Sequence, residues 1–265
     1  MTTLAPTRGP RLDPRIPVLL RPDGTVQLGW SPGHALIVHA PGPVPAFLRL
    51  LDGSRTRPQI LWHARELGFD TEIAAELLTE LAATGLLVAG EPGTRLHAVR
   101  IHGRGPLSDA LDAGLRRIGL RPTRSRADLT LLADTLVPDP VLVAELVRGR
   151  VPHLPVRLRD GHGLIGPLVL PGATSCLRCA DLHRCDRDPA WPRLSAQLLD
   201  RVGHCSPAGV AAVAALALTE IERIAHGNPT RPPATLNATL ELNLDSHHLD
   251  RRPWFPHPRC DCAGR

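Results

Sequence analysis

Residues 166–183 read Gly-Pro-Leu-Val-Leu-Pro-Gly-Ala-Thr-Ser-Cys-Leu-Arg-Cys-Ala-Asp-Leu-His, and this stretch says most about the fold. It contains the pair Cys176 and Cys179, and a second pair, Cys260-Asp-Cys262, lies close to the last residue. Two tight pairs of thiolates are the ligand set of a closed tetrahedral zinc site, which joins distant parts of a chain. A CxxC beside a helix is also typical of redox or disulfide motifs, but that leaves the second pair unexplained. The spacing therefore predicts a structural Zn²⁺ held by Cys176, Cys179, Cys260 and Cys262, with no open position for chemistry.

Two cysteines, Cys185 and Cys205, remain outside this quartet, and we interpret them as buried or incidental thiols rather than nucleophiles. Residues 1–15 are polar and proline-rich and lack the apolar core of a signal peptide. No apolar run approaches the roughly 20 residues that cross a bilayer. We therefore expect a cytoplasmic protein with no membrane partner, in which cysteines are reduced or metal-bound.

The charge is mildly basic, with 31 Lys and Arg against 26 Asp and Glu and a formal net charge of +5. That balance suits an acidic peptide or protein partner and is too diffuse to indicate nucleic acid. The chain contains no lysine and no tyrosine, and aromatic residues make up 3% of it. Mechanisms that need a lysine ammonium are excluded, and a base-stacking surface is disfavoured.

Residues 16–89 predict a small winged-helix domain behind a flexible N-terminus, 1–15. Turn residues and short apolar runs indicate three strands, and periodic apolar positions indicate three helices, the last with Asp70 as its N-cap. A returning strand follows Gly85. The expected segments are strands at 16–20, 25–28 and 35–38, helices at 44–51, 57–67 and 71–84, and a strand at 86–88.

A winged helix most often binds DNA through its last helix. Here that helix carries Glu72, Glu76 and Glu80 and no arginine, so its face would repel phosphate. The sequence therefore favours peptide or protein recognition over nucleic acid.

Residues 90–95 predict a linker, and 96–265 a Rossmann-like, mostly parallel sheet. A strand at 96–102 runs through Gly103-Arg104-Gly105 into a helix at 107–118, which is the opening of a nucleotide-binding unit. The third glycine position is Ser108, Pro106 removes a backbone N–H, and no acid follows at 120–126. Further alternation predicts strands at 128–134, 153–157, 163–170 and 235–244, and helices at 138–148, 175–183 and 206–226. The fold class is therefore α/β with an N-terminal α+β module.

These residues together resemble the ThiF/MoeB-type (ubiquitin-activating-type) superfamily, and more closely its bacteriocin and azoline-peptide biosynthesis branch. The stretch 166–183, followed by Asp186-Arg-Asp-Pro-Ala-Trp-Pro192, carries the closest likeness, and the resemblance covers roughly residues 16–262. Members of that branch bind the leader of a ribosomally made precursor peptide and serve YcaO-type cyclodehydratases. The resemblance implies those two partners, and a homodimer as a further pairing, since relatives of this fold commonly dimerise.

Departures from the superfamily indicate lost ATP chemistry. An adenylating member needs donors for the triphosphate, an acid for ribose or magnesium, and usually an arginine and a lysine. This chain lacks the third glycine, the lysine and the acid on its second strand. Gly103, Gly105 and Asp134 then mark a vestigial nucleotide site, or Asp134 is simply a turn residue at the end of a strand. We expect no bound ATP.

The leading hypothesis is a non-catalytic scaffold whose winged helix binds the leader by adding it as a strand to a sheet edge. We expect that surface at the edge near 26–28 and the groove against 71–84, with Val26, Leu28, Leu77 and Leu81 as candidate contacts that could equally be core residues. His183 is expected on a helix surface rather than as a zinc ligand.

Two alternatives remain open at this point. An active adenylyltransferase would use Cys185 or Cys205 for a thioester and would surround ATP with Gly103, Arg104, Gly105, Arg116 and Asp134. A zinc-containing winged-helix regulator would bind DNA.

Overall fold

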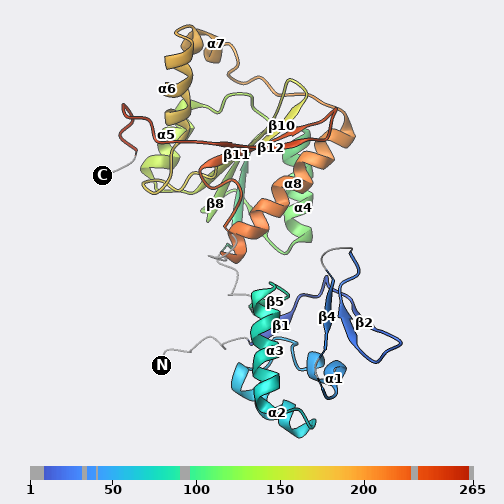
Figure 1. Cartoon of the computed structure of the whole chain (residues 1–265). Coiled ribbons are helices and arrows are strands. Elements are labelled where there is room, and N and C mark those ends of the chain that lie inside the picture. Colours follow the sequence, from blue (N-terminus) through green and yellow to red (C-terminus); the bar gives the residue numbers. More distant parts are fainter. Residues whose placement is uncertain (1–8, 32–34, 40, 90–95, 228–231, 263–265) are drawn as a thin grey trace. The chain divides into compact units, whose positions relative to one another are not determined.

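The computed structural model describes residues 9–31, 35–39, 41–89, 96–227 and 232–262, and the chain divides into two compact units, Met1–Gly93 and Thr94–Arg265. The predicted linker, 90–95, lies outside the described residues. Each unit is described by itself (Figure 1). No helix in the described part of the chain is long and apolar enough to cross a membrane.

The N-terminal unit packs three helices against two small sheets. Asp70 starts the last helix as predicted, because its carboxylate accepts bonds from the backbone N–H groups of Glu72 at 2.8 Å and Ile73 at 3.2 Å. The apolar stripe of that helix closes a core with Phe47, Ile60 and the middle strand. The helices are α1 Val44–Arg49, α2 Arg57–Glu66 and α3 Thr71–Ala83; the strands are β1 Pro10–Leu12, β2 Val18–Leu20, β3 Val26–Leu28, β4 Leu36–Val38 and β5 Leu87–Ala89.

Strand β1 lies inside the segment that the sequence analysis assigned to a flexible N-terminus, and that assignment is wrong for residues 10–12. β1 pairs antiparallel with β5, with Leu12 opposite Leu87, and the Leu12 N–H donates to the Leu51 carbonyl at 2.9 Å. A three-residue strand is too short to show alternation, and its partner lies at the far end of the unit. The pairing of β1 with β5 is therefore visible only in the folded unit.

The C-terminal unit is built on a seven-stranded sheet in the order β12-β11-β10-β9-β8-β6-β7. β7, β6, β8 and β9 run parallel, whereas β10, β11 and β12 each run antiparallel to the strand before. As predicted, most strands of the sheet point the same way. The antiparallel pairs are confined to the side formed by β10, β11 and β12. The strands are β6 Ala98–His102, β7 Arg121–Thr123, β8 Leu129–Ala133, β9 His153–Arg159, β10 His162–Ile165, β11 Ala238–Asn243 and β12 Leu249–Pro253.

Helices cover both faces of this sheet (Figure 1). The alanine-rich α8 and α4 share a core on one face, and α5 and α6 pack on the other. A Cβ on Gly114 of α4 would lie 2.2 Å from a methyl carbon of Leu218, so glycine permits the close approach of the two helices. The helices are α4 Pro106–Arg117, α5 Pro140–Arg148, α6 Leu177–Arg187, α7 Trp191–Ala196 and α8 Pro207–His226.

Two elements of this unit were not predicted. α7 has six residues and β12 five, and every residue of β12 is exposed, so neither shows the apolar periodicity on which prediction depends. Residues 163–170, expected as one strand, form β10 only as far as Ile165.

Candidate functional site

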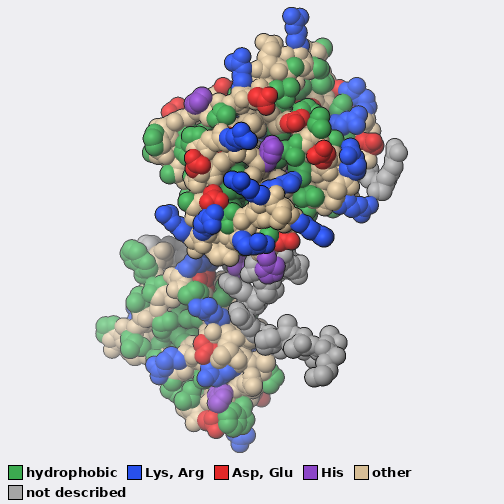
Figure 2. Space-filling model, turned by 180° about the vertical axis from the view of Figure 1, so that it is seen from behind, with side chains coloured by type: hydrophobic (Ala, Val, Ile, Leu, Met, Phe, Trp, Pro, Cys, Tyr) green, Lys and Arg blue, Asp and Glu red, His purple; other side chains and the backbone are tan. Residues whose placement is uncertain are grey.

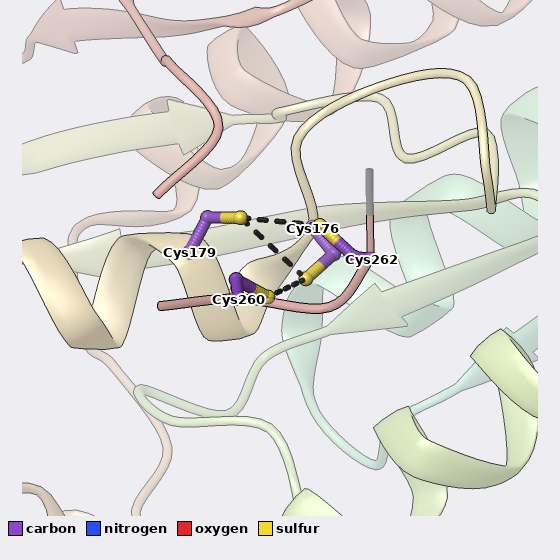
Figure 3. A group of neighbouring side chains, drawn as sticks. All are labelled: Cys176, Cys179, Cys260 and Cys262. Atoms are coloured by element: carbon purple, nitrogen blue, oxygen red, sulfur yellow. Dashed lines mark hydrogen bonds between the residues drawn. The ribbon is translucent and has the colours of Figure 1, made fainter. Parts of the chain in front are cut away.

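The four cysteines of the predicted zinc site converge on one point (Figure 3). Cys176 caps the N-terminus of α6, Cys179 lies in its first turn, and Cys260 and Cys262 come from the segment after β12. All four sulfurs lie within 4.8 Å of one another, with separations of 3.9 Å between Cys176 and Cys179, 3.6 Å between Cys176 and Cys260, and 3.2 Å between Cys179 and Cys262. The structure thus brings together two cysteine pairs that are far apart in the sequence, and they could hold a metal ion.

The spacing of these sulfurs suits a tetrahedral ion. A metal with bonds of about 2.3 Å to four sulfurs places those sulfurs about 3.8 Å apart, close to the separations seen here. Burial raises the pKa of the Cys176 thiol to about 11 and also raises that of Cys262. Burial acts the same way on Cys179, but the backbone N–H groups of His257 and Cys176 outweigh it and lower the pKa of that thiol. Four thiolates at this distance repel one another, so a cation at their centre is the natural compensation.

A histidine and an aspartate hold the tail that carries the second pair. His257 is buried, its Nε2 lies 2.8 Å from a carboxylate oxygen of Asp186 in α6, and its carbonyl accepts the Cys260 N–H at 2.9 Å. Arg259 also binds Asp186. His183 lies outside the sulfur cluster, and its Nε2 is 3.1 Å from the Phe255 carbonyl. These contacts position α6 against the tail. They could not be predicted from hydrophobic periodicity, because they join side chains that are far apart in the sequence.

The Cys205 thiol does not resemble an activated nucleophile. Cys185 and Cys205 are both half-buried, and burial raises the pKa of the Cys205 thiol. The Cys205 sulfur donates to the adjacent Ser206 carbonyl at 3.3 Å. A catalytic thiol would need a lowered pKa.

The structure brings Gly103, Gly105 and Asp134 together at the N-terminus of α4. Asp134 is buried, and its carboxylate accepts hydrogen bonds from the Leu107 N–H at 3.0 Å and from the Ser108 N–H at 3.3 Å. The Ser108 hydroxyl donates to the same carboxylate. These donors form the N-terminus of α4, where a phosphate binds in nucleotide-binding Rossmann folds.

The glycine loop wraps around this carboxylate. A Cβ on Gly105 would lie 2.7 Å from an oxygen of Asp134, and a Cβ on Gly103 would lie 2.5 Å from the Ser108 hydroxyl. Arg104 is exposed, and Arg116 pairs with Asp112 at 3.0 Å on the exposed side of α4. The anion position at this helix is therefore occupied by the chain's own aspartate. In the sequence Ser108 marks only a missing third glycine, whereas in the fold its hydroxyl binds Asp134.

The candidate peptide contacts of the N-terminal unit lie in its core. Val26, Leu28, Leu77 and Leu81 are each at most 3% exposed. β3 is the middle strand of the order β2-β3-β4, with neighbours on both sides, so the expected edge near 26–28 is wrong. Within the described residues, the free edges of this sheet belong to β2 and β4.

Strand β2 carries exposed apolar side chains. Val18, Leu19 and Leu20 are 41%, 39% and 72% exposed. Val18 stands opposite Leu28, so it lies on the same face of the sheet as that core residue. The apolar face of the sheet thus continues beyond its helical cover.

A cavity of about 990 Å³ lies in the C-terminal unit between α5, α6, α7 and the end of β9. Arg157, in the apolar run of β9, lines it and is 7% exposed. The sequence signal for this site is an arginine placed between Val156 and Leu158 in a predicted strand.

Comparison with known proteins shows likeness in structure alone. No family model and no curated protein sequence matches the chain. A structure of the heterocyclase TruD superposes with a TM-score of 0.69 at 20% identity, covering 97% of this chain and 43% of that one. E. coli MccB with AMPCPP and selenomethionine MccA superposes with a TM-score of 0.63 at 11% identity, covering 96% and 99%. The chain therefore spans less than half of the TruD heterocyclase and nearly all of MccB, and it shares the fold of both.

Proposed function

We propose that this chain is a non-catalytic recognition subunit for ribosomally made, post-translationally modified peptides. Its N-terminal unit would act as a winged-helix module that binds the leader of a precursor peptide. The C-terminal unit would be the scaffold that presents the peptide to a YcaO-type cyclodehydratase. The solved neighbours include a heterocyclase with substrate and cofactor, and MccB with MccA.

The observation that carries the non-catalytic assignment is the Asp134 carboxylate at the N-terminus of α4. The backbone donors that would bind a nucleotide phosphate already bind that carboxylate. A triphosphate would have to displace a buried anion and would meet no lysine anywhere in the chain. In this proposal the YcaO-type cyclodehydratase, and not this chain, binds and uses ATP.

Leader binding is assigned to a free edge of the sheet β2-β3-β4. Main-chain bonds to a free strand provide affinity, and apolar pockets beside it provide choice of sequence. β2 supports this assignment because Val18 and Leu20 continue the apolar face beyond the core. Figure 2 shows hydrophobic side chains gathered on the visible face of this unit. The exposed side of α3 carries Glu72, Glu76 and Glu80, which argues against DNA.

The metal is assigned as a structural Zn²⁺. Four cysteines fill the tetrahedron, so the ion would have no open position and would join α6 to the tail. It supplies stability, not chemistry.

Fluorescence anisotropy of a labelled leader, taken from a short open reading frame beside the gene, tests the proposal with the full chain. Val18→Arg and Leu67→Arg form a matched pair, because the two side chains are 41% and 39% exposed and only Val18 lies on β2, on the apolar face of the sheet. We expect the first to weaken binding roughly 10-fold and the second to leave it unchanged. Ile37→Arg examines the β4 edge in the same assay. Absence of leader binding to the folded, zinc-loaded chain, or equal binding by all three variants, would overturn the assignment.

A further inference from the structure

The cavity beside β9 has the size and the walls of a small-molecule site. Its volume of about 990 Å³ falls at the upper end of the roughly 300–1,000 Å³ typical of ligand pockets. Val143 and Val147 of α5, Leu198 and Leu199 after α7, and Trp254 supply apolar surface. The cavity is built entirely from the C-terminal unit, and neither the Gly103–Gly105 loop nor Asp134 lines it.

Arg157 is the buried charge of this cavity. Among the residues that the structure describes, its guanidinium makes one hydrogen bond, a long one of 3.3 Å to the Leu136 carbonyl, and no ion pair. Two neighbouring arginines do have acidic partners, since Arg184 pairs with Asp181 at 2.9 Å and Arg159 with Glu241 at 3.6 Å. A guanidinium has five N–H donors in a planar fork, so most of the hydrogen-bonding capacity of Arg157 is unused.

The surroundings of Arg157 are unfavourable for a lone cation. Burial lowers its pKa to about 10, and the positive charges of Arg184 and Arg159 act in the same direction, while the more weakly acting carboxylates of Asp181 and Glu241 oppose them. Arg184 is held in place between two indole rings, 4.9 Å from that of Trp191 and 5.4 Å from that of Trp254. A buried charge without a direct ion pair is costly, and an anion with two oxygens would both pair with it and satisfy its free donors.

We propose that this cavity binds a carboxylate carried by an apolar group, with Arg157 gripping the carboxylate and the walls of α5 and the α7 region enclosing the apolar part. This site is distinct from the leader-binding edge and does not depend on it. The carboxylate belongs either to a peptide or to a free organic acid, and the two sources share the same recognition chemistry.

Isothermal titration calorimetry on the full, zinc-loaded chain tests the proposal. The probes are N-acetyl-Leu-Phe with a free carboxylate and its amide, and 4-phenylbutyrate and the neutral 4-phenylbutanol. We expect the acid of at least one pair to bind roughly 10- to 100-fold more tightly than its neutral partner, as charge-assisted hydrogen bonds provide. Tight binding by the peptide acid alone identifies a peptide source, and by phenylbutyrate alone a free acid.

Three variants locate the effect. Arg157→Met and Arg157→Gln should each remove the preference for the acid, whereas Arg193→Met, an exposed arginine of α7 outside the cavity lining, should leave it within about twofold. Circular dichroism and zinc content check folding, and if neither Arg157 variant folds, the acid-to-neutral ratio of the unaltered chain decides. Equal affinity for acid and neutral probes, no binding up to about 10 mM, or an acid preference that survives in a folded Arg157 variant would overturn the proposal.

Discussion

Replacing Asp134 with asparagine separates a structural carboxylate from a nucleotide-binding one. The asparagine side chain would keep the shape of the original and would tolerate the left-handed backbone conformation, φ 69°, that this position requires. It would lose the negative charge at the N-terminus of α4 and one of the two acceptor oxygens that bind Leu107 and Ser108. Hydrogen bonds to a buried charged group contribute about 1.5–3 kcal/mol, and the helix dipole adds up to about 1 kcal/mol. We therefore expect Asp134→Asn to lower the free energy of unfolding by about 2–4 kcal/mol.

Urea unfolding of the zinc-loaded chain measures this change. In a Trp30→Phe and Trp62→Phe background, both of them exposed tryptophans of the N-terminal unit, fluorescence reports only Trp191 and Trp254 of the C-terminal unit. With a slope of about 2 kcal/mol per molar urea, the midpoint of unfolding should fall by about 1–2 M.

The matched control is Asp139→Asn at the start of α5. Asp139 is exposed and accepts one bond, from the Val141 N–H at 2.8 Å, and asparagine caps helices as well as aspartate does. Its effect should stay within about 0.5 kcal/mol. If Asp134→Asn is no more destabilising than this control, the carboxylate does not hold the fold, and the argument against a nucleotide at α4 fails.

Four further predictions concern the metal, packing, pH and catalysis. Plasma emission analysis should find about one zinc per chain, and Cys260→Ser should lower both zinc content and the melting temperature while Cys185→Ser changes neither. Gly114→Ala places a Cβ against Leu218 and should destabilise the C-terminal unit by about 1–3 kcal/mol in thermal unfolding. The N–H groups of Ala98 and His97 lower the pKa of Asp128, so its stabilisation is present above about pH 4 and is lost as the pH falls through the lower folded value. Asp128→Asn should therefore lower the melting temperature at pH 7 and have little effect at about pH 2.5, and an equal effect at both would contradict this. ATP–pyrophosphate exchange should not exceed background with any precursor peptide, and a peptide-dependent rate would favour an adenylyltransferase.

The sequence by itself determined the features that are written locally. The spacing of Cys176, Cys179, Cys260 and Cys262 predicted a four-sulfur cluster, because two ligands from one turn need only a short motif. Asp70 and the apolar period after it predicted α3, and the strand-Gly-x-Gly-helix order predicted the start of the α/β sheet. Each of these is recognised from short local motifs, and the cysteine cluster needs only the further step of joining two such motifs.

Tertiary structure decided what depends on distant partners. β1 exists because β5 lies beside it, and β3 is a middle strand because β4 pairs with it. The candidate contacts Val26 and Leu28 are core residues because they pack in one cluster with side chains of the helices. The sequence showed a nucleotide motif with gaps, whereas the folded chain places the Asp134 carboxylate on the donors that a phosphate would use. The charge of Arg157 is likewise ordinary in the sequence and becomes significant only when the sheet and helices remove it from water. Burial and pairing are properties of the folded chain, and these two properties set the chemistry at Asp134 and at Arg157.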